Sequence, residues 1–123
     1  MTQNVIDLDH LSSMTGGDIE LAREVLEIFK HQCEIWGRML DADAPCEQWA
    51  DAAHSIKGAA KSIGAMDLGE ACGQAETRGR EGDVPKAEAG VLISQIKDRM
   101  IEVSEALAQV EHQLSMSEAF KES

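Results

Sequence analysis

The segment AHSIKGAAKSIGA, residues 53–65, indicates both the helical character and the chemistry of this chain. Small and apolar residues recur in it every three or four positions, which is typical of one face of an α-helix. The segment also carries His54, Lys57 and Gly58, which a helix that only packs against its neighbours does not need. Its two faces therefore require separate explanations.

A helical wheel separates these two faces. With about 100° per residue, five apolar residues cluster within about 80° of arc. They are Trp49, Ala53, Ile56, Ala60 and Ile63. His54 projects about 150° away from the centre of that cluster, close to the direction of Lys61. The wheel therefore predicts a buried face and, opposite it, a histidine that faces solvent with two lysines nearby.

The composition favours an all-helical domain. The chain has 123 residues, of which 43% are hydrophobic, and this suits one domain with one core. Helix-forming alanine, leucine and glutamate are plentiful, whereas there are only two prolines. We therefore expect an all-α fold, with the whole of residues 1–123 in a single domain.

The charge and the cysteines limit the partners and the compartment. A formal net charge of −12 disfavours nucleic acid and anionic membrane surfaces, because both would be repelled. The sequence has neither an apolar run of transmembrane length nor a signal-peptide pattern at its start. Cys33, Cys46 and Cys72 are widely spaced, which suggests reduced thiols. A cytoplasmic protein is expected.

Turn signals divide the chain into helices. A short helix is expected around residues 8–11, followed by helices at about 19–40 and 45–63. A fourth helix should begin near residue 67, and a fifth should run from about residue 85 past 107. Asp18 and Asp67 suit N-terminal caps, Gly64 suits a C-terminal cap, and Pro45 suits a first helical position. On the second helix the expected core face is Leu21, Val25, Phe29, Trp36 and Leu40, with Leu26 and Cys33 at its edge.

The apolar residues of the last helix have a heptad rhythm. They are Ala89, Ile93, Ile96, Met100, Val103, Leu107, Val110 and Leu114. This rhythm leaves a coiled-coil dimer open, but an antiparallel four-helix bundle explains all the amphipathic helices together. We expect a monomeric bundle over residues 18–114. An N-terminal segment with a short additional helix (1–17) would precede it, and a frayed tail (115–123) would follow.

An exposed imidazole next to lysines suggests a phosphoryl acceptor. An unprotonated ring nitrogen is a nucleophile near neutral pH, and a bound phosphoryl group would add about two negative charges. Lys57 lies one turn along and can offset them, with Lys61 in support. Gly58 leaves room for a second protein at the expense of helix stability. The alternatives are an ordinary surface histidine, solvated lysines and a glycine needed for packing.

The sequence AHSIKGAAKSIGAMDLGEACGQAE resembles the histidine-containing phosphotransfer (HPt) domain pattern A-H-x-[LI]-K-G-x-x-x-x-[LI]-G. The likeness extends from about residue 18 to about residue 100. It implies a four-helix bundle in which His54 is phosphorylated, Lys57 stabilises charge and Gly58 gives access. Glu76 matches a polar position, often glutamine, beside the histidine, and Arg80 matches a basic position near the site. A solvated helix surface is the alternative for both residues.

The resemblance also implies the partners. The chain would exchange its phosphoryl group with the aspartate of a response-regulator receiver domain in a two-component phosphorelay. A histidine kinase, expected to be of the hybrid type, would supply that group. Magnesium would be bound by the receiver, and this chain would need no cofactor. No G-x-x-x-x-G-K-[ST] loop for ATP is present, so we expect a phosphoryl carrier rather than an enzyme.

Two further interpretations concern binding. Ile28, Ile35 and Met39 form a second apolar group on the second helix, which predicts either a contact patch for the partner or packing under the N-terminal helix. For the chain as a whole, the alternative is a helical adaptor that binds a signalling partner without phosphotransfer. The four histidines lack a ligand spacing such as H-E-x-x-H, which disfavours a metal site.

Overall fold

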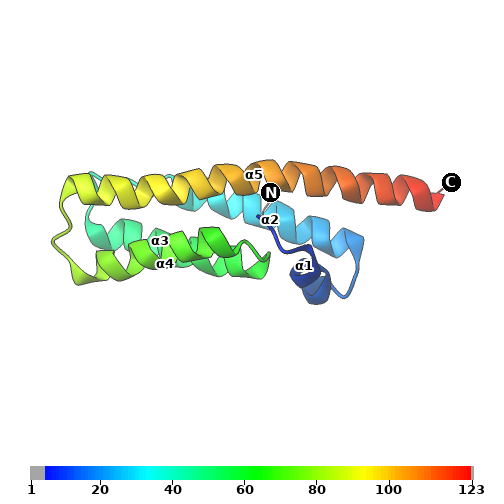
Figure 1. Cartoon of the computed structure of the whole chain (residues 1–123), viewed down its shortest axis with the longest axis horizontal. Coiled ribbons are helices and arrows are strands. Elements are labelled where there is room, and N and C mark those ends of the chain that lie inside the picture. Colours follow the sequence, from blue (N-terminus) through cyan, green and yellow to red (C-terminus); the bar gives the residue numbers. More distant parts are fainter. Residues whose placement is uncertain (1–4, 123) are drawn as a thin grey trace.

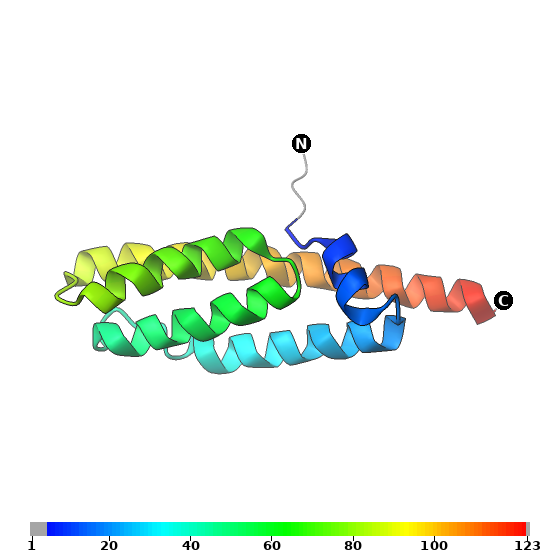
Figure 2. The same ribbon diagram turned by 90° about the horizontal axis from the view of Figure 1, so that it is seen from below.

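The computed structural model describes residues 5–122, with the backbone alone for Leu8 and residues 114–122. This part of the chain forms helices and no strand. The helices are α1 (Leu8–Thr15), α2 (Ile19–Gly37), α3 (Cys46–Ser62), α4 (Met66–Glu81) and α5 (Lys86–Glu122). Helices α2 to α5 run alternately up and down as a bundle, and α1 lies across one end of it (Figures 1 and 2). The predicted all-α bundle with a short additional helix is confirmed.

Two of the predicted caps are present and one is not. The side chain of Asp18 accepts hydrogen bonds from the first backbone N–H groups of α2. At the end of α3, Gly64 has φ +75° and Ala65 N–H donates to the carbonyl of Ala60, a Schellman arrangement. The prediction that Asp67 caps α4 is wrong, because the helix begins one residue earlier and Asp67 lies in its first turn. Pro45 is the N-cap of α3 rather than its first residue.

The predicted core face of α3 is confirmed. All five of its residues are at most 1% exposed, and they are Trp49, Ala53, Ile56, Ala60 and Ile63. The core face of α2 is rotated from the prediction. Leu26, expected at the edge, is fully buried, whereas Leu21, expected in the core, is 42% exposed. Packing against the neighbouring helices decides this rotation, and a wheel drawn for one helix does not contain it.

The N-terminal segment is attached to the loop between α3 and α4. The backbone N–H of Asp7 donates to the carbonyl of Gly64 at 3.1 Å, and Ile6 and Leu11 are buried in the core. At the other end, α5 continues as a helix through Glu122, and Figure 1 shows it projecting past the other helices. The sequence predicted a frayed tail over residues 115–123, and the division of the chain at residues 17 and 114 stays a prediction.

None of the helices in the described part of the chain has the length and apolar composition that a membrane span requires.

Candidate functional site

The structure places the imidazole of His54 on the solvent side of α3. Its side chain is 63% exposed, while Ala53, the residue before it, is fully buried. This alternation follows from the helical pitch, since the apolar stripe turns toward the core of the bundle and leaves His54 at the solvent-facing surface. The predicted orientation of the histidine is therefore confirmed.

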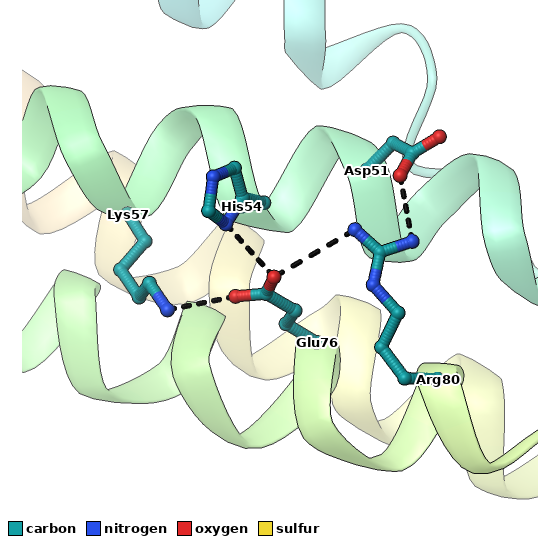
Figure 3. Close-up of polar contacts among 5 residues, drawn as sticks. All are labelled: Asp51, His54, Lys57, Glu76 and Arg80. Atoms are coloured by element: carbon teal, nitrogen blue, oxygen red, sulfur yellow. Dashed lines mark hydrogen bonds and ion pairs between the residues drawn. The ribbon is translucent and has the colours of Figure 1, made fainter.

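A carboxylate from α4 holds one nitrogen of the ring. Nδ1 of His54 lies 2.8 Å from Oε2 of Glu76. The Nζ of Lys57 donates to the other oxygen, Oε1, at 2.7 Å (Figure 3). The side chain of Glu76 is only 16% exposed, so most of it is shielded from solvent. The structure therefore brings Lys57 and Glu76 together at His54, as the helical spacing predicted for Lys57 and the resemblance implied for Glu76.

The hydrogen bond from Lys57 is the main reason that the pKa of Glu76 lies below its ordinary value, and the contact with His54 adds to this effect. The carboxylate is therefore ionised at neutral pH and can only accept hydrogen bonds. Nδ1 of His54 must then carry the proton in their contact. No side chain in the part of the chain that the structure describes hydrogen-bonds the other ring nitrogen, Nε2.

A second ion pair continues the network along the two helices. The guanidinium of Arg80 lies 2.6 Å from Oδ1 of Asp51 and 3.7 Å from Oε2 of Glu76 (Figure 3). Sequence reasoning did not single out Asp51. Its spacing, three residues before His54 on the same helix, was the signal that could have found it. Arg80 therefore links the two helices through carboxylates on both.

The space around Gly58 is open. A Cβ atom built on this glycine would have no heavy atom within 4 Å beyond its own helix, so packing within the chain does not require glycine here. Lys61 is exposed. Together with Lys57, it lines a hollow of about 660 Å³ between α3 and α4. No ion pair or hydrogen bond joins Lys61 to His54 among the described residues.

The apolar group on α2 is not covered by α1. Ile28 is 57% exposed and Ile35 is 45% exposed, so packing under the N-terminal helix, one of the two interpretations of these residues, is wrong. Met39 is half-buried and packs against the core. Ile28 lines an apolar groove of about 260 Å³ together with Met14 of α1 and Ala59 of α3.

Other reactive groups are less suited to chemistry. The three cysteines are free thiols. Burial raises the pKa of Cys33 to about 11 and that of Cys72 to about 12, so both are protonated at neutral pH. Among the described residues, no group of three or more histidine, cysteine, aspartate or glutamate side chains is arranged to hold a metal ion.

The fold and the site define a class of protein, a helical bundle that presents one oriented imidazole to solvent. A model of the Hpt domain family matches residues 17–113, and the chain belongs to that family. The crystal structure of histidine phosphotransferase ShpA from Caulobacter crescentus is similar to it, with a TM-score of 0.75 and 28% identity over 94% of this chain and 99% of that one. No curated protein sequence matches.

Membership of this family identifies the general role. Hpt domains are phosphoryl carriers that interact with receiver domains and kinases. This chain accordingly has a histidine-phosphotransfer role in a phosphorelay. Residues 5–16, which include α1, lie outside the match to the family model.

Proposed function

We propose that Nε2 of His54 is the atom that carries the phosphoryl group, and that its exchange partner is the aspartyl phosphate of a receiver domain. One observation carries the proposal. The ring is exposed, its Nδ1 is held by an ionised carboxylate, and its Nε2 points to no partner among the described residues. Such a ring has an available lone pair on Nε2 and a fixed proton on Nδ1.

The transfer step is a single displacement at phosphorus. The lone pair of Nε2 forms the N–P bond while the bond from phosphorus to the receiver's aspartate breaks, and the electron pair of that bond returns to the aspartate carboxylate. The proton on Nδ1 stays in place beside Glu76. Transfer in the other direction reverses these bond changes. Alignment and charge neutralisation therefore provide most of the catalysis.

The side chains around His54 have distinct roles in this proposal. The ammonium group of Lys57 is one helical turn from the ring and can move from Glu76 toward the phosphoryl oxygens. Lys61 adds positive charge at longer range. Gly58 lets the receiver's active site approach Nε2 because its surface is open. Arg80 supports Glu76 from the other side.

The remaining components belong to the partners. A receiver would supply the aspartate and a bound magnesium ion, and a hybrid histidine kinase would supply the phosphoryl group to the relay. The chain would then act as a carrier with no ATP site and no cofactor of its own. We further propose a monomer in the cytoplasm.

The exposed side chains of Ile28 and Ile35 support a receiver-docking patch on α2. Ile28 shares its groove with Ala59 of α3, which lies about 8 Å along the helix axis from His54 at 1.5 Å per residue. A typical interface buries about 800 Å² on each partner, so it extends more than about 8 Å from its centre. Ala59 also lies about 140° around α3 from His54, so a receiver centred on the histidine would reach this groove by contacting α2 as well as α3. Met39 is a marginal member of the patch because it is half-buried.

Phosphotransfer from a labelled receiver tests the proposal. The chain is incubated with a phosphorylated receiver and the product is treated with acid, since phosphohistidine is lost in acid whereas phosphoserine survives. We expect acid-labile label on the chain and none on His54→Gln. Label that persists in that variant would place the phosphoryl group on another residue. The absence of any label, with each receiver of the source cell, would favour an adaptor.

A further inference from the structure

Glu76 also bears on what happens after phosphorylation. Its contact with Nδ1 of His54 does not involve Nε2, so it can persist once Nε2 is bonded to phosphorus. Lys57 and Arg80 contact the same carboxylate, which favours its ionised form. A phosphorylated ring therefore keeps a negative charge next to its Nδ1 proton.

That proton decides how readily the phosphoryl group leaves. When Nε2 attacks phosphorus and Nδ1 keeps its proton, the ring acquires a positive charge. Breaking the N–P bond then returns the electron pair to Nε2 and releases a neutral imidazole. If Nδ1 has lost its proton first, the departing group is an imidazolate anion, which is a stronger base and a poorer leaving group. Discharge is therefore fast only while Nδ1 is protonated.

We propose that Glu76 is a positioning residue that keeps the Nδ1 proton on phosphorylated His54 to alkaline pH, so that the phosphoryl group discharges rapidly over a wide pH range. The inference rests on the proposed function of His54. A glutamine at this position would accept the same hydrogen bond without the charge. A carboxylate attracts the cationic ring as well, much as the aspartate of a serine-protease triad stabilises the imidazolium next to it.

The other charged groups around the ring do not alter the direction of this effect. On α3 these are Asp51, Lys57 and Lys61, and on α4 they are Glu76 and Arg80. The ion pair of the ring itself is with Glu76 of α4. In Glu76→Gln the negative charge next to Nδ1 is absent, and Lys57 and Arg80, no longer paired with that carboxylate, repel a cationic ring. Both effects favour loss of the ring proton, and that loss slows the departure of the phosphoryl group.

The rate of phosphohistidine hydrolysis against pH tests this inference without a partner protein. The chain, Glu76→Gln and Glu70→Gln are phosphorylated with phosphoramidate and desalted, and the phosphohistidine signal is followed by ³¹P NMR from pH 5 to 10. Glu70 is the matched control because it is an exposed acid on the same helix, about 9 Å from Glu76 along the axis. Circular dichroism confirms that each variant is folded.

We expect all three proteins to lose the phosphoryl group at equal rates near pH 5, where the acidity of the solution keeps the phosphorylated ring protonated with or without the carboxylate. At pH 8.5 Glu76→Gln should discharge about fivefold more slowly, the size expected for a partly exposed charge pair. Glu70→Gln should follow the unmodified chain. Glu76→Asp retains the charge on a shorter side chain, so its rate should lie between those of the chain and Glu76→Gln.

Superimposable profiles for the chain and Glu76→Gln would overturn the inference and leave the proposed function intact. An equally slow discharge of Glu70→Gln at pH 8.5 would also overturn the inference, since the effect would then come from net charge rather than from the contact with His54. The exposed His31 and His112 can also be labelled by phosphoramidate, so the signal of His54→Gln is subtracted from that of the chain. If the chain then shows no phosphohistidine signal of its own, the proposed function falls, and the inference falls with it.

Discussion

Gly58 on α3 and Gly79 on α4 both lie inside helices, but their surroundings differ completely. A Cβ atom on Gly79 would lie 2.8 Å from the ring of Trp49 and 2.9 Å from Cβ of Ala50. A Cβ atom on Gly58 would meet nothing within 4 Å. Gly79 lets α3 and α4 approach each other, whereas Gly58 leaves the surface next to His54 open.

This difference separates the structural face of α3 from its chemical face. Trp49 and Ala50 are fully buried against α4, and they fix the distance between the helices at one end of the bundle. Gly58 follows His54 by one turn and serves no neighbour within the chain. Because glycine in a helix is destabilising by up to about 1 kcal/mol, an exposed glycine beside the histidine suggests selection for access.

The largest expected effect comes from a substitution that tests the packing role of Gly79. Gly79→Ala should destabilise the fold by about 2 kcal/mol, because the new methyl group overlaps a rigid indole ring and a backbone-fixed Cβ. Gly58→Ala is the control and should stabilise the chain by up to about 1 kcal/mol, since alanine favours helices. Urea unfolding followed by circular dichroism measures both. Equal stabilities of the two variants would refute the difference in packing.

The next effect concerns access to the histidine. Gly58→Leu should leave the fold intact and slow phosphotransfer from a receiver about tenfold, because a branched side chain would stand one turn from Nε2. Gly90→Leu on α5 is the matched control, as its Cβ would also meet nothing within 4 Å. The second-order rate constant of transfer is measured for both. An unchanged rate in Gly58→Leu would contradict the role of Gly58 in access.

A smaller effect is expected on α2, which borders the chemical face. Ile35→Asp should weaken receiver binding about fivefold while leaving helicity intact, because it places a charge in an exposed apolar patch. Ile101→Asp makes the same change at an exposed position of α5 and should bind normally. Calorimetric titration with the receiver compares them. If Ile35→Asp binds as tightly as the chain, the patch is not part of the interface.

The smallest effect is a pH-dependent contribution to stability from Glu76. Its pKa is lowered mainly by Lys57, so its ion pairs stabilise the fold above the ordinary pKa of 4.5, and this contribution is lost as the pH falls through the lower, folded value. The chain should therefore be more stable than Glu76→Gln by about 0.5 kcal/mol at pH 7, and the difference should shrink progressively as the pH falls below 4.5. Urea midpoints measured from pH 7 into the acid range provide the measurement, and a difference that does not depend on pH would rule out ionisation as its source.

The sequence predicted most of the fold and the centre of the site. The buried stripe of α3 and the exposure of His54 follow from helical periodicity, which depends only on residue spacing. The errors lie where contacts with other helices determine the rotation or the first residue of a helix. Leu21 was expected in the core because its apolar character fits the α2 stripe, yet the packing of α2 turns Leu26 inward instead. Asp67 was expected as a cap, but α4 begins before it.

The sequence alone determined that one face of α3 is apolar and that the other carries a histidine, a lysine and a glycine one turn apart. Only the tertiary structure decided that Glu76 contacts both His54 and Lys57, and that Arg80 joins Asp51 to the same carboxylate. The spacing of residues along a helix determines the direction in which each side chain points from the axis of that helix. Contacts between helices also depend on the rotation and depth of each one, and the packing of all the buried stripes together sets those quantities.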